Sequence, residues 1–155
     1  MNYWNDWRTN PWSVGRHNSS GSLYISPLMP QQIRPTALVV DDEPLLVELA
    51  ADFLDELGFN TIAKTCPVEA LKWLVRAPSL CLLLTDVQMP KMNGLELAAH
   101  ARRLFLPSLP VIFISGFTTE FFGGEVDLPG STLFLKKPYR SSELQQAIAN
   151  LYRSA

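Results

Sequence analysis

The chain has 155 residues and a mass of 17.4 kDa, which is room for one ordinary domain, because domains cluster near about 100–150 residues. Hydrophobic residues make up 47% of the chain and charged residues 18%, a composition that can bury a core and that excludes wholesale disorder. The formal net charge of -2 argues against a nucleic-acid-binding protein, since such proteins present clusters of lysine and arginine.

No part of the sequence predicts membrane insertion. Spanning a membrane takes about 18 consecutive apolar residues, and the N-terminus lacks the basic and then apolar pattern of a signal peptide. We therefore expect a cytoplasmic protein. The two cysteines, Cys66 and Cys81, have neither metal-ligand spacing nor a disulfide framework, so we expect reduced thiols without a role in function.

Residues 1–35 are predicted to form a disordered N-terminal arm. They contain three tryptophans among Asn, Ser, Gly and Pro, with no alternating or helical apolar period. We expect a solvated tail. A partner-binding or membrane-interface role for the tryptophans is one alternative, although no amphipathic stripe supports it. A translation start at Met29, which would leave only a short lead, is another.

Residues 36–155 show the alternation of short apolar runs and amphipathic segments that is typical of βαβ units around a mostly parallel sheet. A first strand is expected at 37–40, where the apolar run ends at two acids. A proline start and a glycine stop predict a helix over 44–57. A weaker strand follows at 59–63, and a second helix runs over 67–75.

The second half of the domain continues the pattern. A strongly apolar strand at 80–85 ends at an acid, and a third helix is expected over 94–105. Strands at 111–114 and 132–136 follow, and a last helix begins with Ser141 as its cap. The third helix shows these residues at helical offsets: Leu95, Ala98, Ala99 and Arg102.

The segment 118–130 lies between the fourth and fifth expected strands. Its paired glycines allow at most a short helix, because each glycine costs on the order of 1 kcal/mol in a helix interior. Phe121 and Phe122 in this segment are candidates either for a partner site or for burial against the sheet.

Residues that can carry chemistry stand where the expected strands end. In an open α/β sheet every parallel strand delivers its C-terminal end to one edge, so these residues converge in space. They are Asp41, Asp42, Asp86, Ser115 and Lys137. Three carboxylates at one edge repel one another unless a cation is present, and Mg²⁺ is the common oxygen-seeking choice. The set predicts phosphoryl transfer, with Asp86 able to form an aspartyl-phosphate.

Four stretches of the sequence resemble the receiver domain of two-component response regulators. They are Leu-Val-Val-Asp-Asp-Glu-Pro at 38–44, Asp-Val-Gln-Met-Pro-Lys-Met-Asn-Gly at 86–94, Ser115-Gly116 and Lys137-Pro138. The resemblance extends from Thr36 to the C-terminus. It implies a flavodoxin-like fold, that is, a doubly wound five-stranded parallel sheet in the order 2-1-3-4-5 with helices on both faces.

The resemblance also implies roles for the acidic residues. Asp86 would accept a phosphoryl group from a histidine kinase or a phosphotransfer protein. Asp42 would bind Mg²⁺ directly, together with Asp86 and the backbone carbonyl of Gln88, whereas Asp41 would act largely through water.

The remaining roles concern the switch. Ser115 resembles the hydroxyl that moves to bond the new phosphoryl oxygen, and Lys137 resembles the lysine that pairs first with the carboxylate and then with the phosphate. Phe134 matches the aromatic switch position, with an ordinary strand aromatic as the alternative. Pro138 resembles the proline that follows a cis peptide bond.

Taken together, these features predict a single-domain response regulator that is a phosphoacceptor, not an enzyme. Its output would pass to a downstream protein target or to a phosphotransfer domain, since no effector domain follows in the sequence, and a weak homodimer is expected on phosphorylation. The alternative is a receiver-like module that is never phosphorylated and recruits a partner constitutively. A dehalogenase-type phosphatase is set aside because it needs an Asp where Gln88 stands, and His100 is expected to be a surface residue.

Overall fold

A parallel sheet organises the computed structural model, which describes residues 33–76, 79–116 and 130–153. Its strands lie in the order β2-β1-β3-β4-β5, and every neighbouring pair is parallel. The strands are β1 (Thr36–Val40), β2 (Asn60–Lys64), β3 (Leu80–Asp86), β4 (Val111–Ser115) and β5 (Thr132–Lys136). This is the predicted order, so the expected doubly wound fold is confirmed.

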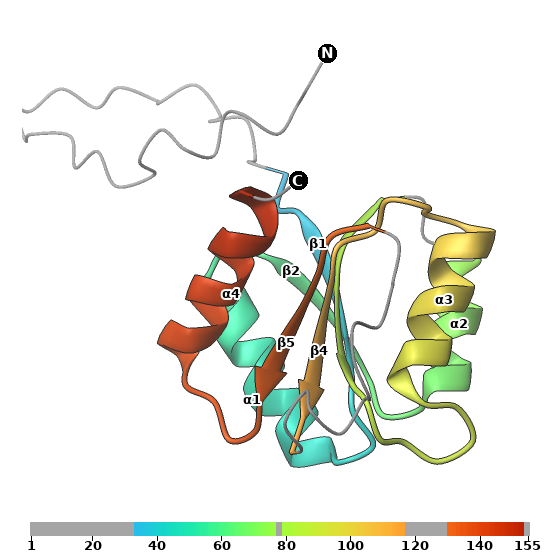
Figure 1. The fold of residues 1–155 in the computed structure, drawn as a ribbon, viewed down its shortest axis with the longest axis horizontal. Helices are drawn as coiled ribbons and strands as arrows, with labels where there is room; N and C mark the ends of the chain where they lie inside the picture. The colour runs from blue at the N-terminus through green and yellow to red at the C-terminus, as the bar shows by residue number, and fades with distance from the viewer. Residues whose placement is uncertain (1–32, 77–78, 117–129, 154–155) are drawn as a thin grey trace, which may run out of the picture. The chain divides into compact units, whose positions relative to one another are not determined.

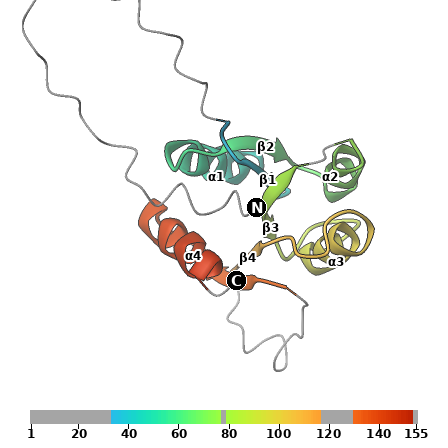
Figure 2. The ribbon, with the colours of Figure 1, turned by 90° about the horizontal axis from the view of Figure 1, so that it is seen from above.

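Helices cover both faces of this sheet. The described helices are α1 (Pro44–Glu56), α2 (Pro67–Leu74), α3 (Gly94–Leu104) and α4 (Ser141–Arg153). Helices α1 and α4 lie on one face, and α2 and α3 lie on the other (Figure 1 and Figure 2). The sheet therefore forms the middle of three layers. The described helices cover its two faces and not the ends of its strands.

Two apolar clusters, one on each face of the sheet, form the core. Strand β1 supplies both, because successive side chains of a strand point to opposite faces: Ala37 and Val39 join the cluster under α1 and α4, and Leu38 and Val40 join the other. All seven residues of the central strand β3 are buried. Burial on both faces explains why β3 reads as a continuous apolar run rather than an alternating one.

The predicted boundaries agree with the structure to within one or two residues. Of the α3 residues expected at helical offsets, Ala98 and Arg102 are buried and Leu95 is half-buried. Leu97 and Ala101 are buried, whereas Ala99 is exposed. The last helix also begins at Ser141 itself, and its first turn is closed by the amide of Arg140, which donates to the Glu143 carboxylate at 2.7 Å. Ser141 is therefore the first helical residue and not the cap.

Two predictions fall largely outside the described part of the chain, namely the N-terminal arm and the segment before β5. The last residues of the predicted arm, 33–35, are described, and they contact the domain. Pro35 accepts a hydrogen bond from the Asn60 amide at 2.8 Å, and the Arg34 guanidinium donates to the Asp55 carbonyl at 3.4 Å. Among the described helices, none has the length and apolar character that crossing a membrane requires.

Candidate functional site

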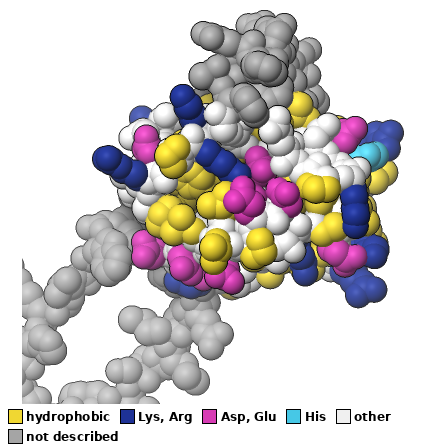
Figure 3. Space-filling model, turned by 90° about the horizontal axis from the view of Figure 1, so that it is seen from below, with side chains coloured by type: hydrophobic (Ala, Val, Ile, Leu, Met, Phe, Trp, Pro, Cys, Tyr) yellow, Lys and Arg dark blue, Asp and Glu magenta, His cyan; other side chains and the backbone are white. Residues whose placement is uncertain are grey.

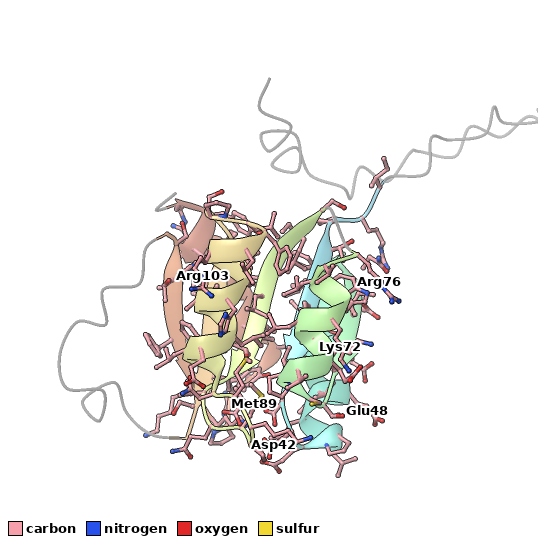
Figure 4. All side chains as sticks on the ribbon, turned by 90° about the vertical axis from the view of Figure 1, so that its right-hand side faces the viewer. Asp42, Glu48, Lys72, Arg76, Met89 and Arg103 are labelled. Atoms are coloured by element: carbon pink, nitrogen blue, oxygen red, sulfur yellow. The ribbon has the colours of Figure 1, made fainter. Side chains whose placement is uncertain are left out.

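Three carboxylates gather at the C-terminal edge of the sheet. Asp41 follows β1, Asp42 comes next, and Asp86 is the last residue of β3; a carboxylate oxygen from each lies within 4.8 Å of the others. Figure 3, which looks onto this end of the molecule, shows acidic side chains near the centre with a basic side chain beside them and hydrophobic side chains around them. In Figure 4, Asp42 lies at this end close to the loop that carries Met89.

Lys137, which follows β5, reaches into this acidic cluster. Its Nζ donates to Asp41 Oδ2 at 2.7 Å and lies 3.3 Å from Asp86 Oδ2. Burial alone would lower the pKa of Lys137, but the hydrogen bond and charge of Asp41, together with the charge of Asp86, outweigh burial and raise that pKa above its ordinary value. The ammonium group is therefore firmly charged and partly neutralises two carboxylates at once.

Asp86 lies at the end of β3 with little exposure to solvent. Its side chain is buried, and the amide of Gln88 donates to Asp86 Oδ1 at 3.4 Å. Burial raises the pKa of Asp86 above its ordinary value, and the neighbouring charge of Asp41 adds to this, although Lys137 acts in the opposite direction. A bound cation would offset the repulsion between the ionised carboxylates of Asp86 and Asp41.

The loop from β3 to α3 fixes the surroundings of Asp86. The amide of Gly94 donates to the Val87 carbonyl at 2.9 Å, and Lys91 adopts a left-handed φ of 71°. Asn93 begins α3 with a reciprocal cap, because its side chain accepts from the Glu96 amide while Glu96 accepts from the Asn93 amide. These contacts turn the chain sharply beside the carboxylate.

A shallow depression of about 530 Å³ opens on this loop next to the acidic cluster. It is formed by loop residues and the first turn of α3: Val87, Gln88, Met89, Pro90, Asn93 and Leu95. The depression is lined mainly by apolar groups.

The other predicted switch residues also lie at or near this edge. Ser115 is buried at the end of β4, and its carbonyl accepts from the Lys137 amide at 2.8 Å. Phe134 is half-buried in β5 and stacks on Phe113 with ring centroids 5.2 Å apart. The peptide bond between Lys137 and Pro138 is cis. The fold thus brings together, at one edge, the acidic, hydroxyl and lysine residues that the sequence placed at separate strand ends.

Two residues in the immediate surroundings of Asp86 were missed by sequence reasoning. The Thr85 hydroxyl donates to the Asp86 carbonyl at 3.0 Å, and a side chain at Gly94 would collide with that same carbonyl. Thr85 stands inside an apolar strand run, so no pattern marks it. Gly94 was read as a helix start and as the end of the receiver-like stretch 86–94, without a steric role; a glycine at the beginning of a helix, where serine or alanine would serve, was the available signal of close approach.

Comparison with known proteins decides the family. A family model described as the response regulator receiver domain matches residues 37–149. The chain belongs to the response regulator receiver family. Receiver domains are the phosphoacceptors of two-component signalling, act with histidine kinases or phosphotransfer proteins, and generally bind Mg²⁺ at an acidic pocket. The carboxylate oxygens of Asp41, Asp42 and Asp86 are the hard ligands that Mg²⁺ prefers, so this receiver domain has a donor set that fits the ion.

Individual relatives agree with this assignment. The receiver is 34% identical over 114 residues to the transcriptional regulatory protein CrdR of Helicobacter pylori, covering 74% of this chain and 53% of CrdR. It is 29% identical over 118 residues to the response regulator receiver protein CpdR of Brucella abortus, covering 76% of this chain and 97% of CpdR. The chain thus spans about half of CrdR, and it covers only 16% of the sensor kinase LuxN of Vibrio campbellii.

Solved structures give the same fold. A response regulator receiver protein from Sinorhizobium medicae superimposes with a TM-score of 0.67 at 26% identity, covering 78% of this chain and 96% of that protein. The chemotaxis protein CheY4 of Vibrio cholerae gives a TM-score of 0.69 at 23% identity, covering 76% and 98%. The receiver fold predicted from the sequence is confirmed by both.

Proposed function

We propose that this receiver accepts a phosphoryl group on Asp86 from a phosphohistidine of a kinase or phosphotransfer protein. An oxygen of the Asp86 carboxylate forms the new bond to phosphorus while the phosphorus–nitrogen bond of the donor breaks, and the freed imidazole takes a proton from solvent. The observation that carries this proposal is the position of Asp86 beside Lys137 Nζ, at 3.3 Å, within a cluster of three carboxylates.

Several residues around Asp86 would assist this reaction, by binding Mg²⁺ or by orienting Lys137. Asp42 and Asp86, with the backbone carbonyl of Gln88, would hold Mg²⁺ directly, and Asp41 would act through water. Bound there, the ion supplies positive charge that offsets the charge of the transferring phosphoryl group. Asp41 meanwhile orients the ammonium group of Lys137, through the 2.7 Å contact, toward the phosphoacceptor.

The same residues provide a switch. A phosphoryl group on Asp86 adds about −1.5 to −2 charge and three strong acceptor oxygens. Lys137 and Ser115 are the donors proposed to bond these oxygens, so Lys137 has to exchange part of its contact with Asp41 for one with the phosphate. Phe134, on the strand that leads to Lys137, is proposed to report this change to the surface by altering its packing on Phe113.

The exposed face of α1 is proposed to receive the phosphodonor. Helix α1 begins two residues after Asp42, and its first two turns expose Leu45 at 79% and Leu49 at 45%. A donor protein has to bring its histidine to the Asp86 carboxylate, which lies at the same edge. Apolar side chains beside a buried reactive group are what a protein partner contacts, whereas a small phosphodonor needs no such surface.

The organisation of the whole chain is also a proposal. Residues 36–155 form the receiver domain, preceded by the arm 1–35, and this domain acts in the cytoplasm, where kinases charge their histidines from ATP. Its phosphorylated form passes the signal to a downstream protein target or onward to a phosphotransfer domain, with weak homodimerisation as an accompanying effect. The competing reading is a module that binds its partner without phosphorylation.

The deciding experiment is the intact mass of the purified chain after incubation with acetyl phosphate or phosphoramidate, with and without Mg²⁺. We expect a single phosphoryl adduct that requires Mg²⁺, is lost in base, and is absent from Asp86→Asn. Asp52→Asn, which removes an exposed carboxylate from α1, is the matched control and keeps the adduct. An adduct that persists in Asp86→Asn overturns the site; no adduct in a folded, Mg²⁺-binding protein favours the unphosphorylated module.

A further inference from the structure

A buried arginine joins α3 to the start of β5, far from the acidic site. Arg102 is only 4% exposed. Its Nε donates to the Leu109 carbonyl at 3.0 Å, and its Nη2 donates to the Ser131 carbonyl and to Thr132 Oγ1, each at 3.0 Å. The guanidinium therefore bridges three elements: its own helix, the turn that enters β4, and the first residue of β5.

The described groups that bond the Arg102 side chain are neutral. Among residues 33–76, 79–116 and 130–153, no carboxylate forms an ion pair with it and no group accepts a hydrogen bond from its buried Nη1. Gly130, at φ 91°, passes so close that a Cβ there would lie 3.4 Å from the guanidinium carbon. Burying a guanidinium is costly unless it is hydrogen-bonded or paired, and a leucine or methionine would fill an apolar position at lower cost. The three directed hydrogen bonds are therefore what an arginine contributes here and an apolar side chain could not.

Helix α3 and strand β5 both run from the neighbourhood of Arg102 to the acidic site. Helix α3 begins at Gly94, which is packed against the Asp86 carbonyl, and Arg102 lies in its last turns. Strand β5 begins at Thr132, which Arg102 holds, and leads directly to Lys137. Figure 4 shows the far end of α3, marked by Arg103, opposite the end at which Asp42 lies. One helix and one strand thus connect the phosphoacceptor to its lysine through this guanidinium.

Strand β5 depends on such a tie more than the other strands do. It lies at the edge of the sheet and pairs with β4 alone. None of its five residues is fully buried, in contrast to β4, where all five are. Main-chain pairing fixes which residues of β4 and β5 face each other, but it does not fix β5 relative to α3. Phe134 packs into the apolar cluster that also holds Leu97 of α3, and apolar packing has little directional preference, so the directed hydrogen bonds of Arg102 are the contacts that can fix the start of β5 against this helix.

From these contacts we infer that Arg102 is a positioning residue: by holding the start of β5 against α3, it sets where the Lys137 ammonium lies relative to Asp86. The inference rests on the proposed phosphorylation of Asp86 for its kinetic consequence. The placement of β5 itself does not depend on that function and is measured separately.

A double-mutant cycle tests the kinetic consequence. The rate of Asp86 phosphorylation by phosphoramidate in saturating Mg²⁺ is measured for the parent, Arg102→Gln, Lys137→Ala and the double variant. If Arg102 acts through Lys137, Arg102→Gln slows the parent by at least about fivefold but changes the Lys137→Ala protein by less than about 1.5-fold. An equal fold-change in both backgrounds overturns the inference, because a general loss of stability acts regardless of Lys137.

Hydrogen exchange of backbone amides tests the placement of β5 without any phosphorylation. Arg102→Gln is expected to speed exchange in Thr132–Lys136 by at least about tenfold while β1 and β3 change by less than about twofold. A uniform increase over the sheet, or none in β5, contradicts the inference. If the parent takes no phosphoryl group while β5 alone loosens, the proposed function fails and the positioning role of Arg102 stands.

Two further variants keep the test decisive. Tyr152→Phe removes another side-chain hydrogen bond to a main-chain carbonyl, that of Cys81 in β3 at 2.9 Å, and it is expected to leave both the β5 exchange and the phosphorylation rate within about twofold of the parent. Thr132→Val deletes only one acceptor of Arg102 and serves if Arg102→Gln does not fold. It should reproduce the β5-specific change at smaller size, and its failure to do so counts against the inference.

Discussion

Lys137 donates to the carboxylate of Asp41 at 2.7 Å although the two residues lie 96 positions apart in the sequence. The same ammonium group lies farther, at 3.3 Å, from the proposed phosphoacceptor Asp86. Before phosphorylation, the lysine is therefore held chiefly by the neighbouring carboxylate. A phosphoryl group on Asp86 would offer Lys137 stronger hydrogen-bond acceptors. The site would then have two arrangements, one with the ammonium group on Asp41 and one with it on the phosphoryl group.

Replacing this lysine separates its two contributions. In Lys137→Met, the acidic cluster loses its internal cation, so we expect Mg²⁺ to bind as tightly as in the parent or several-fold more tightly, corresponding to about 1 kcal/mol of relieved repulsion. Phosphorylation by a small donor should slow by about 10²-fold, because a positioned charge is lost from the reacting centre. Calorimetric Mg²⁺ titration and intact-mass kinetics measure the two effects.

The control is Lys136→Met, which removes the same charge from the exposed neighbour. It should leave both quantities within about twofold of the parent. Equal effects of the two substitutions would mean that net charge, and not the contact with Asp41 and Asp86, governs the site.

The buried carboxylate of Asp86 predicts a pH-dependent stability. Its pKa is raised in the folded protein, chiefly by burial, so the folded state binds the proton more tightly than the unfolded state does. The folded state therefore loses stability as the pH rises through that pKa and Asp86 ionises. In EDTA at neutral pH, Asp86→Asn should be more stable than the parent by on the order of 1 kcal/mol, and this gain should shrink as the pH falls and the parent's carboxylate becomes protonated.

Denaturant unfolding between neutral and acidic pH provides the measurement. Asp52→Asn, at an exposed position on α1, is the reference and should gain less than about half as much at neutral pH. A gain for Asp86→Asn that grows toward acidic pH would show that the sign of the pKa shift is wrong.

Gly94 should be intolerant of even one added methyl group. A Cβ there would collide with the Asp86 carbonyl and lie 3.1 Å from Thr85 Oγ1. Since the neighbour is main chain at the end of a buried strand, it has little freedom to move, and Gly94→Ala should destabilise the fold by about 1–3 kcal/mol and slow Asp86 phosphorylation. Thermal unfolding and intact-mass kinetics measure the two losses.

Gly116→Ala is the matched substitution, because a Cβ at Gly116 would meet no atom of the described residues within 4 Å, its chain neighbours aside. It lies beside Ser115 at the same edge, yet its effect on stability should stay within about 0.5 kcal/mol. A similar loss in the two variants would contradict the steric explanation for Gly94.

The proposed docking face on α1 predicts a difference between donors. Leu45→Ala removes an exposed apolar side chain, so it should leave folding and phosphorylation by phosphoramidate unchanged within about twofold, while transfer from a phosphorylated histidine kinase domain that serves the parent falls by about tenfold. Leu104→Ala, at the end of α3 where 56% of the leucine is exposed, should not change transfer. An equal loss with both donors would place Leu45 in the site itself rather than on a docking surface.

Much of this fold can be predicted from the sequence, for a physical reason. Strands of a parallel sheet that are buried on both faces have to be continuous apolar runs, and the run from Leu80 to Asp86 is one. Pro44 and Pro67 begin helices because their missing amide hydrogens are not needed there. Acids, a hydroxyl and a lysine at successive strand ends converge at one edge in any such sheet, so their meeting follows from topology.

Other features were decided only by the tertiary structure. Arg102 was read as one more position on a helical face, and nothing in its neighbours indicates that its partners are a carbonyl seven residues away and groups 29 and 30 residues away. The contact of Thr85 with the Asp86 carbonyl has no local signal either, and the glycine at the start of α3 indicates a close approach without indicating which group it approaches. The sequence by itself determined which residues stand at the strand ends, because strand ends follow from local patterns, whereas the strand order was expected only from the family resemblance. The tertiary structure decided how they are held there, because distances between elements are set by packing across many positions at once.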